Sequence, residues 1–198
     1  MKINLRNNRF LFFGTLLFFT LGFVNIHFAA LGFICMILPM VLLVRDKRKT
    51  WCQSYCPRAN LFTKCGRITS GCSYKTPKLF IKGPMNSIML AYFGISLFVI
   101  IISTIMVAKG SVEPMKYLRF LMIIPLYGEM PQLFVFTGFP VWFTHMAYRF
   151  YSMMMTTTIL GLILAIVYKP RTWCIICPIA TISEMYLKGR KVKNEKPA

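Results

Sequence analysis

Two short cysteine motifs, far apart in the chain, nearly repeat each other. The first is KTWCQSYCP at residues 49–57, and the second is RTWCIICP at residues 171–178. Each starts with a basic residue and Thr-Trp-Cys, ends on Cys-Pro, and follows a long apolar segment. Four thiolates brought to the same depth of a membrane are the usual ligand set of an iron–sulfur cluster. The predicted cluster ligands are Cys52, Cys56, Cys174 and Cys177.

The residues around the motifs suit such a cluster. A proline after the second cysteine is well placed at the first position of a helix. The N-terminus of that helix offers free N–H groups and partial positive charge, which stabilise a thiolate and raise the potential of a cluster. We expect Lys49, Arg58 and Arg171 to add positive charge. We expect Trp51 and Trp173 to anchor the motifs at the lipid headgroups and to shield the cluster from water.

The other cysteines leave alternatives open. Six of the seven fall on the predicted cytoplasmic side, where structural disulfides are rare. A zinc site or a redox-active dithiol is compatible with the motifs, although the Cys-Pro ending and the membrane-surface position favour iron–sulfur. Cys65 and Cys72 could replace one motif pair, complete a second cluster, or remain loop thiols without a ligand. Cys35 lies within an apolar segment and is predicted to be a packing residue.

The composition indicates an integral membrane protein. Of the 198 residues 57% are hydrophobic, and they come in long blocks typical of transmembrane helices. The first block has no small-residue cleavage site and is followed by further spans, so it is not predicted to be a signal peptide. The net charge of +19 does not indicate nucleic acid, because the basic residues flank the apolar blocks. Of 24 Lys and Arg, 20 fall on one predicted side, which the positive-inside rule makes cytoplasmic.

The predicted fold is an all-α integral membrane protein with four transmembrane helices in two tandem hairpins and both termini cytoplasmic. It forms a single membrane domain, 1–198, with a short helix after each Cys-Pro motif. The first hairpin covers 10–44 and the cytoplasmic loop with the first motif covers 45–86. The second hairpin covers 87–168, with an outer re-entrant or interfacial segment at 109–150, and residues 169–198 hold the second motif and a basic tail. The predicted spans are Phe10–Val24, Phe28–Val44, Ser87–Ala108 and Tyr151–Tyr168.

Both histidines, His27 and His145, are predicted to lie on the outer side. They could contact a quinone, bind a haem together, or simply hydrogen-bond to backbone or water at the interface. A cluster at the inner face would be separated from them by the membrane thickness of about 30 Å. That distance is too long for one efficient electron transfer, so either a second centre exists or the acceptor binds near the cluster.

The paired motifs and the hairpins before them resemble the membrane-bound 4Fe-4S proteins of the NapH/NosR/CcoG type. The resemblance covers the four-span core and implies electron transfer between a quinol pool or soluble donor and a partner redox protein. The second motif is one residue shorter than the family pattern. The chain also lacks the C-terminal ferredoxin segment that many members carry and the outer flavin-binding domain of the NosR type. The resemblance therefore implies a membrane core that passes electrons to a separate partner.

The sequence thus predicts an electron carrier, or a subunit of an oxidoreductase, in the inner (cytoplasmic) membrane. Its partners would be membrane lipid, a cytoplasmic ferredoxin- or flavodoxin-like donor and a partner redox subunit, and no nucleic acid. An acidic donor would be attracted by the basic cytoplasmic face. Two alternatives stay open: a quinone-coupled membrane thiol–disulfide oxidoreductase, and a non-catalytic metal-binding assembly subunit.

Overall fold

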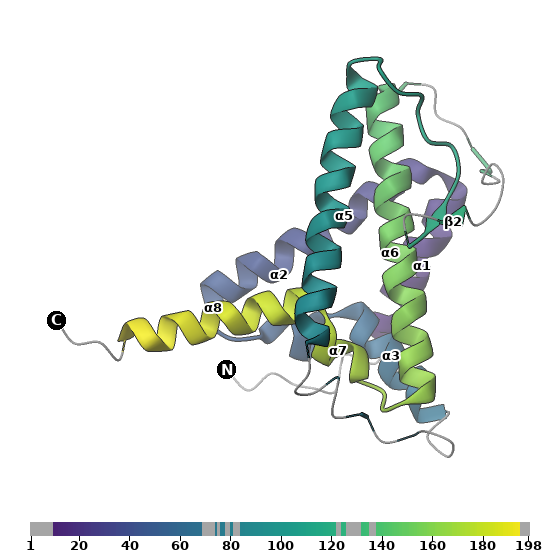
Figure 1. The fold of residues 1–198 in the computed structure, drawn as a ribbon. Coiled ribbons are helices and arrows are strands. Elements are labelled where there is room, and N and C mark those ends of the chain that lie inside the picture. The colour runs from purple at the N-terminus through teal and green to yellow at the C-terminus, as the bar shows by residue number, and fades with distance from the viewer. Residues whose placement is uncertain are drawn as a thin grey trace. The chain divides into compact units, whose positions relative to one another are not determined.

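The computed structural model describes residues 10–68, 74, 76–77, 80, 84–121, 124–125, 132–134 and 138–194. It is mostly helical, at 78%, as predicted (Figure 1). The helices are α1 (Leu11–Val24), the 3₁₀-helix η2 (Ile26–Leu31), α2 (Gly32–Asp46), the π-helix η3 (Trp51–Tyr55), α3 (Pro57–Ile68), α5 (Met85–Ala108), α6 (Val141–Val167), α7 (Thr172–Ile176) and α8 (Pro178–Asn194). Two short strands, β1 (Arg119–Phe120) and β2 (Ile124–Pro125), pair antiparallel.

Three helical segments in the described part of the chain are long and apolar enough to cross a membrane. They are Ile26–Asp46, Met85–Ala108 and Val141–Val167. Helix α1 is also apolar but has 14 residues, fewer than the roughly 17 that a spanning helix needs. The structure therefore supports three candidate spans, and the fourth stays a prediction.

The last long helix begins at Val141, not at the predicted Tyr151. Residues 141–150 thus belong to α6 and not to the outer segment expected at 109–150. Pro140 precedes the helix, and its carbonyl accepts the Phe143 N–H at 3.0 Å. The polar side chains of this first part interrupt the apolar pattern of the sequence. His145 among them is only 1% exposed, so the fold buries a group that was expected in the outer re-entrant or interfacial segment.

The contacts divide into two compact units. The first unit comprises Met1–Phe13, Cys35–Ala91 and Gly161–Ala198, and it contains both cysteine motifs. The second comprises Gly14–Ile34 and Tyr92–Leu160, and it contains both histidines. In the second unit Tyr151 is fully buried, and its hydroxyl donates to the Phe19 carbonyl at 3.0 Å. Its ring lies against those of Phe18, Phe19 and Phe23.

In the first unit, close packing brings the surroundings of the two motifs together. Gly66 of α3 is buried against Pro170, which immediately precedes the second motif. One turn earlier, Phe62 is 1% exposed and its ring lies on Gly161 of α6. Both approaches depend on glycine, because a side chain would occupy the space that the neighbour fills. The helix after the first motif is therefore held against the chain that leads into the second.

Gly66→Ala tests this packing. An added Cβ would lie 2.8 Å from the Pro170 backbone Cα, which cannot move aside as a flexible side chain could. We expect the overpacking to cost about 1–3 kcal/mol, more than the gain of about 1 kcal/mol in helix propensity. The measurement is the melting temperature in detergent, which should fall.

Gly189→Ala in α8 is the matched control, because its Cβ meets nothing within 4 Å. Helix propensity alone should then raise the melting temperature. If both alanine variants shift the melting temperature in the same direction, Gly66 is not closely packed against Pro170.

Candidate metal centre

The two motifs fold alike despite their different spacing. In the first, Cys52 lies in the π-helix η3, and the Cys56 N–H donates to the Trp51 carbonyl at 2.9 Å. In the second, Cys174 lies in the α-helical turn α7. A π-turn takes up one residue more than an α-turn. It therefore accommodates the extra residue of the Cys-x-x-x-Cys spacing.

Both motifs then present their second cysteine in the same way. Cys56 and Cys177 have extended backbones, with ψ of 111° and 127°. Each is followed by a proline that starts a helix, α3 at Pro57 and α8 at Pro178. The predicted helix after each Cys-Pro motif is confirmed. A thiol at this position lies beside the free N–H groups of the helix that follows.

The four motif thiols lie close enough to act on one another electrostatically. Burial raises the pKa of Cys52 to about 11, and the charges of Cys177 and Cys56 add to the shift. Burial also raises the pKa of Cys174 to about 12, with further contributions from Cys56, Cys177 and Cys52. Thiols from both motifs therefore share one partly buried site. Deprotonating all four there requires compensating positive charge.

Part of that compensation comes from the protein. Burial raises the pKa of Cys177, while the backbone N–H groups of Ala180 and Ile179 donate to its sulfur and lower it. These N–H groups belong to the first turn of α8. The guanidinium of Arg58 also favours the Cys177 thiolate.

The other two predicted cations also act on motif thiols. Lys49 acts on Cys52 and Arg171 acts on Cys174, in each case lowering the pKa of the thiol. Burial lowers the pKa of Arg58 itself, and the thiols Cys56, Cys35 and Cys177 raise it. Each motif is thus flanked by positive charge that stabilises thiolates.

Among the described residues, no three His, Cys, Asp or Glu side chains are placed to hold one metal ion. Four thiolates can bind either a zinc ion or a four-iron cluster.

The two tryptophans of the motifs have different surroundings. Trp173 is 5% exposed, so it packs inside the protein and is not an anchor at the headgroups. Trp51 is partly exposed and lines a pocket at the end of α2. Of the two predicted anchors, only Trp51 has exposed side-chain surface that could contact lipid.

The three remaining cysteines lie outside the two motifs. Cys65 lies within α3, outside both motifs, and is partly buried. Cys72 lies outside the described residues. Cys35 of α2, predicted to be a packing residue, lies in electrostatic range of Cys56 and Arg58. Only the fold reveals this neighbourhood, since nothing in the local sequence around Cys35 marks it.

Both histidines are hydrogen-bonded within the second unit. His27 Nδ1 lies 2.6 Å from Asn25 Oδ1, and His27 Nε2 lies 3.1 Å from Thr144 Oγ1. His145 Nδ1 accepts the Met115 N–H at 2.9 Å, and its Nε2 lies 3.2 Å from Ser103 Oγ. These partners occupy both nitrogens of each ring. The structure gives no support for the predicted quinone contact.

Fold and site together define a helical protein whose partly buried thiols suit a metal cluster. Residues 28–66 and 151–195 match the family model described as a 4Fe-4S binding domain. The matched stretches contain both cysteine motifs and the helices that follow them. The match supports an iron–sulfur binding protein that carries a 4Fe-4S cluster. Comparison with curated proteins and with solved structures gave no match.

Proposed function

We propose that this chain is a membrane electron-transfer protein of the NapH/NosR/CcoG type. Its single [4Fe-4S] cluster is held by Cys52, Cys56, Cys174 and Cys177 at the cytoplasmic face. The observation that carries the proposal is that thiols from two distant motifs share one partly buried site, within the stretches that match a 4Fe-4S binding family model. When bound, the cluster supplies one-electron chemistry. The chain holds it, shields it and provides the cations that set its potential.

The proposed topology has four spans with both termini cytoplasmic. Three helices have the length for it, and α1 with its 14 residues would be the fourth, in a thinned bilayer or with its ends at the headgroups. The uneven distribution of Lys and Arg supports the orientation. Both motifs then face the reducing compartment, where thiolates remain available to iron.

A polar cleft beside Cys174 supports docking of an electron donor at that point. The cleft, of about 430 Å³, is lined by Lys49, Asn86, Cys174, Ile175, Ala180, Thr181, Glu184, Met185 and Lys188. Glu184 bridges the two lysines, at 3.3 Å from Lys49 and 3.6 Å from Lys188. A carboxylate of an acidic ferredoxin or flavodoxin could take the place of Glu184. The donor would then lie next to Cys174, a proposed cluster ligand that lines the cleft.

Lys188→Glu should therefore slow reduction of the cluster by an acidic ferredoxin roughly tenfold at low salt, since steering by charge changes association rates by 10-fold or more. The rate is measured by stopped-flow absorbance of the oxidised cluster mixed with reduced ferredoxin. The difference from wild type should shrink at high salt, because exposed charges are screened.

The charge-matched control is Lys109→Glu, at an exposed residue of the second unit. It should leave the rate unchanged. Equal slowing by both variants would show a general charge effect, and no salt dependence in the wild type would contradict donor docking at this face.

The function itself is tested on protein purified without oxygen. About four iron and four sulfide per chain, with an EPR signal after reduction, are expected for one [4Fe-4S] cluster. A midpoint potential within reach of biological donors, and reoxidation by an added one-electron acceptor, would support electron transfer. A cluster that no physiological donor reduces would contradict it and favour an assembly role.

A further inference from the structure

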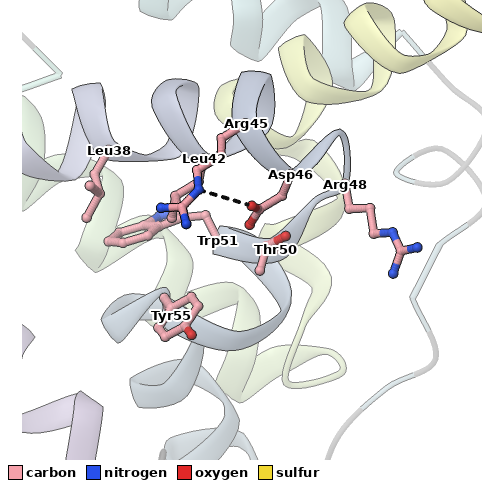
Figure 2. A pocket seen from close by; sticks show the side chains of 8 residues that line it. All are labelled: Leu38, Leu42, Arg45, Asp46, Arg48, Thr50, Trp51 and Tyr55. Carbon is pink, nitrogen blue, oxygen red and sulfur yellow. Dashed lines mark ion pairs between the residues drawn. The ribbon is translucent and has the colours of Figure 1, made fainter. Parts of the chain in front are cut away.

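A second pocket lies at the C-terminal end of α2, next to the first cysteine motif. It has a volume of about 600 Å³ and is lined by Leu38, Leu42, Arg45, Asp46, Arg48, Thr50, Trp51 and Tyr55. Figure 2 shows these side chains, with the ion pair of Arg45 and Asp46 and with Arg48 pointing away from the others. One part of the lining is apolar, and the other carries a guanidinium and hydroxyl groups. A ligand that fills it must therefore be amphiphilic.

The apolar part of this pocket continues onto the exposed surface of α2. Ile37 and Val41 are 61% and 53% exposed. Val41 and Ile37 precede Arg45 by four and eight residues, so all three lie on the same face of the helix. Together with Leu38 and Leu42 they form an apolar strip that ends at Arg45. An acyl chain lying along this strip would bring its headgroup to the guanidinium.

The charged part of the pocket is suited to a phosphate. Arg45 ends a segment long and apolar enough to span a membrane, which places it at headgroup depth. A guanidinium binds phosphate through two parallel hydrogen bonds. The Asp46 carboxylate lies 3.9 Å from Arg45 Nε, and the Arg45 side chain is 79% exposed. This long, exposed ion pair leaves the guanidinium able to bind a second anion.

We propose that this pocket binds an anionic phospholipid, with its phosphate on Arg45 and one acyl chain along α2. The π-helix that forms part of the pocket, from Trp51 to Tyr55, also carries Cys52. π-turns are often found at functional sites. The bound lipid would thus hold the segment that positions the first motif. The proposal rests on the membrane location proposed above, but it does not depend on the cluster.

Three single substitutions with different expected outcomes test the site. Arg45→Gln should weaken binding of phosphatidylglycerol roughly fivefold, the usual effect of one basic residue near anionic lipid. Asp46→Asn removes the competing carboxylate and should strengthen binding by roughly the same factor. Lys47→Gln removes an adjacent charge that does not line the pocket and should weaken binding far less than Arg45→Gln does.

Binding is measured by native mass spectrometry of the full chain in detergent, titrated with dioleoyl phosphatidylglycerol or dioleoyl phosphatidylcholine. Preferential retention of phosphatidylglycerol, with the three expected changes, would support the site. Equal retention of both lipids, or equal effects of Arg45→Gln and Lys47→Gln, would overturn it. Displacement of the lipid by millimolar inorganic phosphate would overturn it too, because a free anion would then suffice.

Iron content separates this test from that of the proposed function. None of the three substituted residues is a predicted ligand or one of the cations found to act on the motif thiols. All variants should therefore hold as much iron as the wild type. If Arg45→Gln loses the preference for phosphatidylglycerol but keeps its iron, Arg45 acts in lipid binding and not in cluster binding.

Discussion

Cys174→Ser is expected to abolish the 4Fe-4S cluster, with iron falling from about four per chain to less than one. The reason is that Cys174 is partly buried and lies close enough to Cys52, Cys56 and Cys177 for their charges to raise its pKa. A serine hydroxyl is a poor substitute for a thiolate as an iron ligand. The measurement is iron and sulfide analysis of protein purified without oxygen, together with EPR after reduction.

Cys65→Ser provides the matched control for this prediction. Cys65 lies in α3, nine residues after Cys56 and outside both Cys-Pro motifs. The control should keep its iron and its EPR signal. If Cys65→Ser lost the cluster and Cys174→Ser kept it, the proposed ligand set would be wrong. Zinc in place of iron in the wild type would also reject the cluster.

Arg58→Gln should make the cluster harder to reduce. The guanidinium acts on Cys177 and is itself influenced by Cys56 and Cys35, so its charge lies next to the proposed cluster. Removing a positive charge disfavours the more negative, reduced state. A charge in a partly shielded site contributes roughly 1–2 kcal/mol, and about 59 mV corresponds to 1.4 kcal/mol for one electron. The midpoint potential should therefore fall by roughly 50–100 mV.

The potential is measured by a redox titration followed by EPR. Arg67→Gln, in the last turn of the same helix, is the control with an equal loss of charge. Its potential should change far less, because Arg67 lies nine residues, more than two helical turns, beyond Arg58 and so farther from Cys56. Equal potentials for the wild type and Arg58→Gln would show that Arg58 does not tune the cluster.

Features that depend on local chemistry could be predicted from the sequence. A Cys-Pro pair favours a helix start, and α3 and α8 do begin at Pro57 and Pro178. Long apolar runs predicted helices, and three of them are long enough to span a membrane. The repeated motif predicted iron–sulfur binding, which the family match supports over both motif regions. These inferences needed only neighbouring residues and their spacing.

Features that depend on contacts between distant residues required the tertiary structure. The start of α6 at Val141 was missed because polar residues such as His145 interrupt the apolar pattern, whereas the fold buries His145 and satisfies it with hydrogen bonds. The closeness of Cys35 to Arg58 has no local signal. Hydropathy and motif spacing indicate the local structure that each segment tends to form. Which side chains meet across α2, α3 and α8 is decided by packing, since interior groups must fill space and find partners that lie far away in the sequence.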